Sequence, residues 1–499
     1  MASLIEIRQE RLRKIDELRK LGINPYPARS SRTNSNKEIT DGFATFENKE
    51  VILVGRLMSW REHGPICFGD IEDESGRIQL YLKQDVLLPL DKEKGSLGFS
   101  ELALLDVGDF VQATGKIVKT KTGQISIEVA GLILLTKSLR PLPDKHEGLK
   151  DPELIFRQRY LDLATNPDRR EFFKRKSKFW EVNREFMKER GFLEVETPVL
   201  EQVPGGADAA PFTTHHNALD QDFYLRISTE LYLKRLIGGG FEKVFTLGPN
   251  FRNEGIDDEH LQEYSQIEWY WAYADYRQNM EMVRDMFRRI ATEVYGKTKF
   301  VKGDHVFDLA DNWQEIDYTQ SIKDKTGIDI WSANEGDMEK ALVKQGIKLE
   351  GAVNRARLVD NLWKTVRKTI PGPAFLINEP KFMSPLAKSK YDNPDLTERF
   401  HIVLAGSELG NGYSELNDPI DQLARFKEQQ NARDAGDSEA QMLDVDFVEM
   451  LEYGMPPVSG YAHSERLFFF LENLPAREAT LFPQLRRKTT DIQKELYGM

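Results

Sequence analysis

The sequence predicts an α+β protein in which a small N-terminal β-barrel precedes a larger domain of long helices and strands. Several short strand patterns between Val51 and Leu135 are typical of a small barrel. The proline- and charge-rich segment 137–150 then predicts an inter-domain connection. From Pro152 onward, helical periodicity alternates with strand patterns, and a length of 499 residues requires at least two domains.

The composition is that of a globular protein, because 40% hydrophobic residues can supply a sizeable core and 30% are charged. A net charge of -12 argues against a general nucleic-acid binder but leaves room for a local basic patch. A solvated helix face and an RNA contact both remain open for the basic N-terminal residues. These are Arg8, Arg11, Arg13, Lys14, Arg19, Lys20, Arg29, Arg32 and Lys37.

The single cysteine, Cys67, excludes an intramolecular disulfide and a multi-cysteine metal site. The first residues, MASLIEIRQERLRK, lack the apolar core of a signal peptide. No apolar run approaches the length that spans a bilayer. We therefore expect a soluble, cytoplasmic protein without a membrane partner.

The N-terminal elements follow in order. An apolar stripe predicts a helix over Ile5–Leu21, and Gly22 ends it. Short strand patterns follow, and an OB-type barrel is preferred to a small sandwich as their arrangement. The strand patterns cover 51–57, 77–82, 109–117 and 124–129. The expected divisions are a lead-in at 1–45, the barrel at 46–140, a linker at 141–155 and the larger domain at 156–499.

In the larger domain, a strong helix is predicted over Arg169–Arg190 and ends at Gly191. Strands are predicted at 192–195 and 244–254, with a return strand at 268–274. The polar, helical stretch at about 297–394 carries no active-site signal and is interpreted as an insertion.

The run FRNEG places Arg252 and Glu254 two residues apart, hence on one face of the predicted strand. An arginine can clamp a phosphate or a carboxylate with two hydrogen bonds, and His260 in the following connection offers a further phosphate contact. On spacing alone, a surface Arg–Glu pair is the favoured interpretation.

Glu408 and Glu415, in ELGNGYSE, would face opposite sides of a regular strand. A bulge at Gly410-Asn411-Gly412 would bring both carboxylates to one face, where they suit magnesium with phosphates. A glycine-rich turn with exposed acids is the alternative.

Further polar positions allow both a structural and a functional interpretation. Glu230 opens a helix, where it could contact a ligand or simply stabilise the helix dipole as an acid in the first turn. Glu268 and Tyr270 share a strand face, and an acid with a phenol can hold an ammonium group. Gly206, in PGGADAAPF, allows close backbone approach to a ligand, or a plain turn. The sequence contains no GxxxxGK[ST], HExxH or GxSxG motif.

Together these segments resemble the class II aminoacyl-tRNA synthetases, specifically the lysine enzyme. GFLEVETP (191–198) looks like motif 1, FRNEG like motif 2, and residues 459–483 lie where motif 3 belongs, with Arg466 as its arginine. Longer runs point to lysine rather than aspartate or asparagine. They are TKTG, RPLPDK, RQRYLDL, PGGADAAPF, THHNALD, ELYLKRL, AYADY and GNGYSELNDP, in family order.

The resemblance implies an OB barrel that reads the anticodon, followed by an antiparallel sheet flanked by helices, in a homodimer formed through motif 1. It implies that ATP activates lysine to lysyl-adenylate, which then acylates the 3′ end of tRNA(Lys), with Mg²⁺ as the cofactor. Positioning and charge neutralisation then carry the rate. A lysyl ligase acting on a protein and an inactive or regulatory RNA-binding paralogue are the alternatives.

The resemblance also implies residue roles. Arg252 and Arg466 would be catalytic, with Arg252 on the α-phosphate and the lysine carboxylate. The ATP contacts would be Arg252, Glu254, His260, Tyr264, Glu408 and Arg466. The lysine contacts would be Gly206, Glu230, Arg252, Glu268, Tyr270 and Asn417. The magnesium ligands would be Glu408 and Glu415. The anticodon contacts would be Arg56, Arg61, Phe68 and Gln79, although Phe68 also suits a barrel core.

Two positions depart from the family pattern. The two glycines usual in motif 3 are Tyr461 and His463 here, and its aspartate is Glu465. The asparagine usual after the motif 2 histidine is Leu261. These departures predict an altered approach of the backbone to adenine, or an altered ATP affinity.

Overall fold

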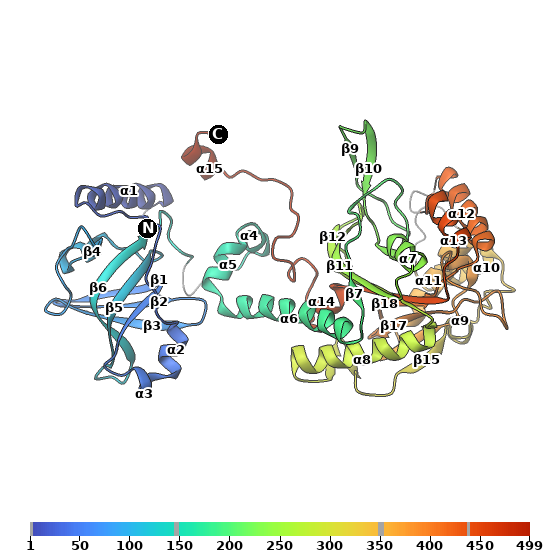
Figure 1. The fold of residues 1–499 in the computed structure, drawn as a ribbon, viewed down its shortest axis with the longest axis horizontal. Helices are drawn as coiled ribbons and strands as arrows, with labels where there is room; N and C mark the ends of the chain where they lie inside the picture. Colours follow the sequence, from blue (N-terminus) through green and yellow to red (C-terminus); the bar gives the residue numbers. More distant parts are fainter. Residues whose placement is uncertain (1–2, 144–148, 348–353, 437–439) are drawn as a thin grey trace. The chain divides into compact units, whose positions relative to one another are not determined.

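The computed structural model describes residues 3–143, 149–347, 354–436 and 440–499. The chain forms two compact units, Met1–Asn166 with Gln484–Met499, and Pro167–Pro483 (Figure 1). The unit boundary thus lies at residue 166, and the last residues of the chain belong to the N-terminal unit.

The N-terminal unit is built on a closed barrel, as the OB-fold prediction requires. Its sheet order is β3-β2-β1-β5-β6-β4, and parallel pairing of β3 with β6 closes five strands into the barrel (Figure 1). The interior is an apolar cluster that includes Leu53, Leu80, Val111 and Leu132. The strands are β1 (Glu50–His63), β2 (Ile66–Glu72), β3 (Arg77–Lys83), β4 (Ser96–Leu97), β5 (Phe110–Lys119) and β6 (Ile125–Thr136).

The N-terminal unit also contains helices. They are α1 (Leu4–Lys20), α2 (Asn36–Asp41), α3 (Phe43–Phe46), the 3-10 helix η1 (Phe99–Leu104), α4 (Pro152–Arg157), α5 (Arg159–Thr165) and α15 (Asp491–Tyr497). The predicted helix at 5–21 is confirmed, with Ser3 closing a capping box at its start. Part of the predicted linker, 144–148, lies outside the described residues.

Two of the basic N-terminal side chains, Arg11 and Lys14, connect helix α1 to the rest of the N-terminal unit. The Arg11 guanidinium is buried and donates to the carbonyls of Ser138 at 3.1 Å and Val107 at 3.1 Å. Lys14 Nζ donates to Asp106 at 2.9 Å. Arg11 and Lys14 therefore have structural partners within this unit, and neither is a free surface charge.

The second unit is centred on an eight-stranded sheet of order β15-β16-β17-β18-β19-β12-β11-β7. The strands from β16 to β11 pair antiparallel, and only the two outermost pairings are parallel. The strands are β7 (Leu193–Glu194), β11 (Lys243–Phe251), β12 (Glu263–Ala272), β15 (Gln314–Asp317), β16 (Ala374–Ile377), β17 (Arg399–Leu404), β18 (Ser407–Ser414) and β19 (Val458–Ser464).

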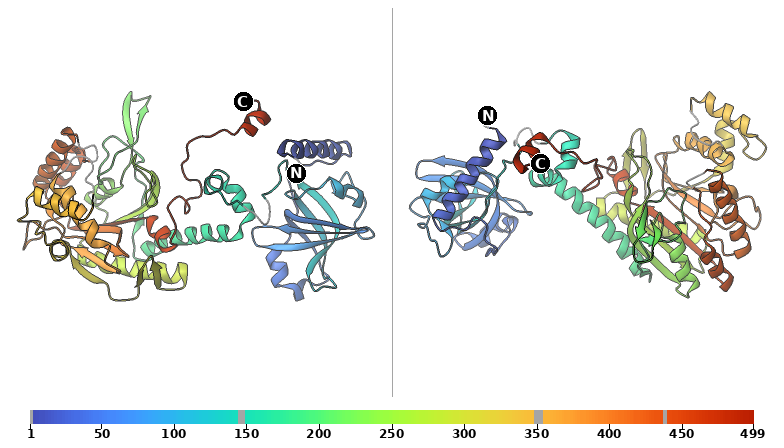
Figure 2. Two further views of the ribbon diagram at one scale, coloured as in Figure 1. Left: turned by 180° about the vertical axis from the view of Figure 1, so that it is seen from behind. Right: turned by 90° about the horizontal axis from the view of Figure 1, so that it is seen from above.

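Helices cover both faces of this sheet (Figures 1 and 2). On one face, α6 (Pro167–Glu189), α8 (Tyr276–Tyr295) and α14 (Arg466–Leu471) pack on alternate sheet residues such as Phe245 and Trp269. On the other, α7 (Glu230–Gly238) and α13 (Val445–Tyr453) pack on Val244 and Tyr270. The period-two alternation of strand side chains produces both cores.

Smaller elements complete this unit. They are β8 (Leu200–Glu201), β9 (Thr213–His216), β10 (Gln221–Leu225), β13 (Lys299–Lys302), β14 (His305–Asp308), α9 (Tyr318–Thr326), α10 (Glu335–Lys344), α11 (Arg355–Arg367), the 3-10 helix η2 (Lys381–Met383) and α12 (Pro419–Asp434). Within the stretch interpreted as an insertion, β15 and β16 extend the main sheet. None of the helices in the described ranges is long and apolar enough to cross a membrane.

Two sequence predictions need correction. The strand predicted at 244–254 ends at Phe251 and its return begins at Glu263, so Glu254 lies in the connection and not on the strand. The barrel strand β2 was not predicted, because the glycine and the charged residues in ICFGDIE obscure its alternation. The long helix predicted at 169–190 is confirmed by α6.

Candidate active site

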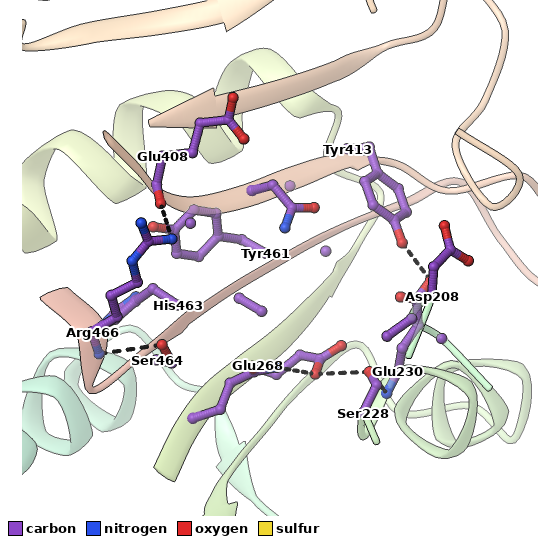
Figure 3. A pocket seen from close by; sticks show the side chains of 18 of the residues that line it. Asp208, Ser228, Glu230, Glu268, Glu408, Tyr413, Tyr461, His463, Ser464 and Arg466 are labelled. Carbon is purple, nitrogen blue, oxygen red and sulfur yellow. Dashed lines mark hydrogen bonds between the residues drawn. The ribbon is translucent and has the colours of Figure 1, made fainter. Parts of the chain in front are cut away.

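A cavity of about 360 Å³ lies on the α7 side of the central sheet and is lined mainly by polar residues. Its walls come from β12, β18 and β19, from the start of α7, and from the two loops at 206–208 and 252–261. Figure 3 shows Glu230, Glu268 and Tyr413 at one end and Glu408 with Arg466 at the other. Segments that are distant in the sequence therefore meet in one pocket.

The acidic end is organised around Glu268 and Tyr270 of β12, which alternation places on the pocket face. Glu268 is 3% exposed and Tyr270 2% exposed. The Tyr270 hydroxyl donates to Glu268 Oε1 at 2.8 Å, while Thr229 Oγ1 and Gln266 Nε2 donate to Oε2 at 2.8 and 2.9 Å. Burial, and then the charge of Glu230, raise the pKa of Glu268. A buried acid in this setting suits a cationic ligand group.

Glu230 and Gly206 form the adjacent wall. Gly206 has φ +83°, and a Cβ there would lie 2.7 Å from Glu230 Cβ, so the close approach of this loop requires glycine. The backbone N–H of Gly206 donates to Gln441 Oε1 at 3.4 Å, and Gln441 Nε2 donates to Asp208 at 3.3 Å. Gln441 thus ties the glycine loop to the segment that precedes α13.

The bulge predicted in ELGNGYSE is confirmed. The β17–β18 register shifts between the His401–Asn411 pair and the Val403–Glu408 pair, which leaves one extra residue in β18. Both Glu408 and Glu415 consequently line the pocket. Their partners differ, however, and each carboxylate faces protein cations of its own.

Glu415 is 1% exposed and forms an ion pair with Lys234 of α7. Glu408 accepts a hydrogen bond from the Trp363 indole, and its carboxylate lies 3.5 Å from an Arg367 nitrogen and 3.5 Å from His401 Nδ1. Burial alone would raise the pKa of Glu408, but these neighbours hold it below the usual value.

The expected role of Glu408 and Glu415 as magnesium ligands stays a prediction, because in this structure both carboxylates are paired with side chains of the protein. In the described ranges, no group of three or more His, Cys, Asp or Glu side chains is arranged to hold a metal ion. Glu415 pairs with the buried cation Lys234. Sequence spacing could not reveal this, because Lys234 comes from another element.

The opposite end of the pocket carries the two arginines. The Arg252 guanidinium lies 5.5 Å from the centre of the Tyr264 ring, and its Nε is buried without a hydrogen-bond partner among the described residues. Arg466 Nη1 donates to the carbonyl of Glu408 at 3.1 Å, and Nη2 pairs with Glu259 of the connection between β11 and β12. Both guanidinium groups are thus placed for an anionic ligand.

Glu254 and His260 line the same end and are exposed. His260 Nδ1 lies 2.7 Å from an Asp257 carboxylate oxygen. Asn417 is not among the lining residues. Its Oδ1 accepts from Lys388 Nζ at 2.6 Å and its Nδ2 donates to the Met455 carbonyl at 3.0 Å, so the structure does not bring it to Glu268 and Tyr270.

Several lining residues were not predicted from the sequence as ligand contacts. These are Asp208, Arg399, Asn411, Tyr413 and Gln441. Asn411 and Tyr413 stand in the glycine-rich run beside Glu415, and that position was a signal for them. Arg399 and Gln441 had no comparable signal.

The predicted anticodon residues gather on the outer face of the barrel. Phe68 is half-buried and stacks on Tyr81 with ring centres 5.2 Å apart and planes 7° from parallel, so it is not barrel core. Phe68 pairs with Arg61 across β1–β2, and Gln79 Oε1 accepts from Ser126 at 2.9 Å. Arg56 lies over the Phe110 ring at 4.3 Å. An aromatic platform beside cations is typical of single-strand binding.

Comparison with known proteins agrees with this arrangement. The family model for class II tRNA synthetases (D, K and N) matches residues 151–486, and the model for the OB-fold nucleic acid binding domain matches residues 51–135. The lysine–tRNA ligase of Shouchella clausii is 42% identical over 98% of this chain and 97% of its own length. Those of Thermotoga maritima (43%; 97% of each chain) and Thermoanaerobacter sp. strain X514 (44%; 97% of this chain and 96% of its own) are similarly close.

The chain belongs to the class II lysyl-tRNA synthetase family. Within this synthetase, Tyr461 and His463, which replace the two glycines of motif 3, pack their rings in the core although both residues also line the pocket. Tyr461 and His463 pair with Trp269 and Ile267, whose side chains face α6 and α8, whereas Gly460 pairs with Tyr270 on the pocket face. The pocket thus keeps glycine where a Cβ would lie 2.5 Å from Glu415 Oε1.

The His463 ring is enclosed by aromatic side chains of the synthetase core. Its centre lies 5.7 Å from those of Phe287 and Tyr461 and 6.2 Å from that of Phe179. Burial lowers the pKa of His463 to about 3. Leu261, the second departure, is partly buried against the same core while lining the pocket. His463 and Leu261 therefore both contribute to packing in the apolar core.

Proposed function

We propose that the chain is a lysine–tRNA ligase, which activates lysine with ATP to lysyl-adenylate and transfers the lysyl group to the 3′ end of tRNA(Lys). The observation that carries this proposal is the buried acid–phenol pair Glu268–Tyr270 at one end of a pocket whose other end holds Arg252 and Arg466. An uncharged side chain would leave Glu268 desolvated and unpaired, which favours lysine over neutral amino acids.

In this proposal the α-ammonium of lysine lies at Glu230 and the Gly206 loop, and its ε-ammonium lies at Glu268 and Tyr270. Arg252 holds the lysine carboxylate and the α-phosphate together and is therefore a catalytic residue. The observation that supports this role is its buried Nε, which has no hydrogen-bond partner among the described residues. The reaction needs no protein nucleophile. Alignment of the reactants and neutralisation of charge lower the barrier.

ATP occupies the other end of the pocket. Arg466, Glu254, His260 and Tyr264 surround it, with Tyr264 beside adenine. Magnesium accompanies the nucleotide phosphates as part of the substrate, and Glu408, whose backbone carbonyl accepts from Arg466, is a carboxylate that could hold it. Mg²⁺ bound to phosphates needs only one or two protein carboxylates, so the lack of a larger cluster in the described ranges does not oppose this role.

The barrel face formed by Arg56, Arg61, Phe68 and Gln79 binds the anticodon. Its stacked Phe68–Tyr81 pair offers a platform for a base. A role in protein synthesis places the enzyme in the cytoplasm.

We also propose a homodimer formed through motif 1. The sheet edge there is the two-residue strand β7, and exposed apolar side chains surround it. Leu193 is 49% exposed and Leu200 44% exposed. A second copy would cover this edge. Sedimentation equilibrium tests the dimer, and a fully active monomer would exclude it.

Exchange of labelled pyrophosphate into ATP tests the activation step. We expect exchange with lysine and none with aspartate or asparagine. Charging of tRNA(Lys) transcripts tests the second step. Exchange without tRNA charging would favour a ligase acting on a protein, and folded protein without exchange would favour a non-catalytic RNA-binding role.

A further inference from the structure

Lys234 is a buried cation directly behind the acidic end of the pocket. It is the fourth residue of α7 after Glu230, it has no exposed surface, and it is not among the lining residues. Its Nζ donates to Glu230 Oε1 at 2.6 Å and forms an ion pair with Glu415. Lys234 thus joins two acids that reach the pocket from different elements.

Aromatic rings enclose the remaining surroundings of this ammonium group. Nζ lies 5.4 Å from the centre of the Tyr413 ring and 5.9 Å from those of Tyr270 and Phe447. A cation without access to water is stable only if anionic partners and ring faces replace its hydration. The charge of Lys234 is therefore committed to Glu230 and Glu415.

The charges of the pocket can then be counted. Three buried carboxylates line its acidic end, Glu230, Glu268 and Glu415, each less than 5% exposed, and the more exposed lining residues Asp208 and Arg399 carry opposite charges that cancel in this count. Lys234 offsets one of these three negative charges. Two remain, which matches the two ammonium groups of lysine, while Arg252 offsets the lysine carboxylate.

Lys234 also fixes the direction of Glu230. The Tyr413 hydroxyl donates to Glu230 Oε1 at 2.5 Å (Figure 3). The same oxygen accepts from Lys234. With two donors on Oε1, the other oxygen, Oε2, is left to accept from a ligand.

We propose that Lys234 is a positioning and charge-matching residue that sets the pocket to accept a ligand with two ammonium groups and one carboxylate. This inference rests on the proposed function, because it takes lysine as the ligand. Lys234 does not touch the ligand. It acts through Glu230 and Glu415.

The test compares lysine with lysinamide, which keeps both ammonium groups but lacks the carboxylate and so carries one more net positive charge. The quantity measured is the ratio of the inhibition constant of lysinamide to the KM of lysine in lysine-dependent pyrophosphate exchange. Lys234→Met adds one net negative charge to the pocket and should lower this ratio about tenfold or more. Glu415→Gln removes one and should raise the ratio.

The double variant Lys234→Met/Glu415→Gln restores the net charge, so its ratio should return to that of the parent even if both constants rise. Lys137→Met is the matched control, because Lys137 is an equally buried lysine paired with Asp109 at 2.7 Å in the N-terminal unit. Its ratio should not change.

A purely structural role would weaken lysine and lysinamide in proportion, so an unchanged ratio in both Lys234→Met and Glu415→Gln would overturn the inference. If Lys234→Met does not fold, Glu415→Gln and the double variant still decide it. A parent protein without lysine-dependent exchange would instead refute the proposed function, and calorimetric titration of the same two ligands would then supply the ratio.

Discussion

The hydroxyl of Tyr270 donates a 2.8 Å hydrogen bond to Glu268 Oε1, and both side chains point from β12 into the same pocket. With neutral donors from Thr229 and Gln266 on its other oxygen, the Glu268 carboxylate is held in place by uncharged groups. A desolvated carboxylate in this state gains most from a cationic ligand.

We expect Glu268→Gln to raise the KM for lysine by about 100-fold, because it removes the charge that pairs with the ligand ammonium group. Tyr270→Phe removes one hydrogen bond and should cost only about tenfold. Steady-state pyrophosphate exchange gives both values, with the KM for ATP as the internal control. An equal rise of the KM for lysine in both variants would contradict the prediction that the Glu268 charge contributes more to lysine binding than the Tyr270 hydroxyl.

Glu259→Gln should lower the KM for ATP severalfold. In the structure Glu259 pairs with Arg466, so the nucleotide phosphates must displace this carboxylate before they reach the arginine. Exchange assays at saturating lysine measure the change. Asp304→Asn, an exposed acid in the β13–β14 turn, provides the control. A raised KM for ATP would indicate that Glu259 assists the nucleotide.

Phe68→Ala should raise the KM for tRNA(Lys) by about 5- to 100-fold in the charging reaction, since stacking of a base on an aromatic side chain is lost. Lysine-dependent pyrophosphate exchange should stay at the parent level. The control is Leu88→Ala, which alters another exposed apolar residue of the N-terminal unit. Loss of exchange together with charging would mean that Phe68 acts on folding.

Protonation of His463 should lower the free energy of unfolding of the second unit, Pro167–Pro483, in mild acid. The pKa of His463 is about 3 when folded against an ordinary value of 6.5, so the unfolded state binds more protons between these values and stability falls as pH drops below 6.5. At pH 5 the loss relative to pH 7 is about 2 kcal/mol. His463→Phe should remove this component.

Denaturant unfolding at pH 7 and pH 5 measures that difference. His215→Phe is the control, because His215 is exposed on the β9–β10 hairpin. The same pH dependence in the parent and in His463→Phe would rule out protonation of His463 as the cause.

Local patterns predicted much of this molecule. Period-two alternation placed Glu268 and Tyr270 on one face, and the glycines of β18 predicted the bulge that turns Glu408 and Glu415 into the pocket. These features depend on neighbours in the sequence. Their partners do not, because Lys234 and Trp363 approach from helices far along the chain, so the sequence did not predict that Glu415 and Glu408 pair with them.

The same limit applies to Tyr461 and His463. Sequence comparison identified them as departures at glycine positions, but only the β12–β19 register shows that their side chains enter the core beside Trp269. A change at a functional motif can therefore be a change in packing.

We propose that the pocket recognises the charge of the lysine side chain. Norleucine has a side chain of nearly the same shape without the ε-ammonium group, so the most direct measurement is the ratio of kcat/KM for lysine and norleucine in pyrophosphate exchange. A site built around a buried acid should favour lysine by about 10⁴-fold. A ratio near one would contradict the assignment of Glu268 and Tyr270 to the ammonium group.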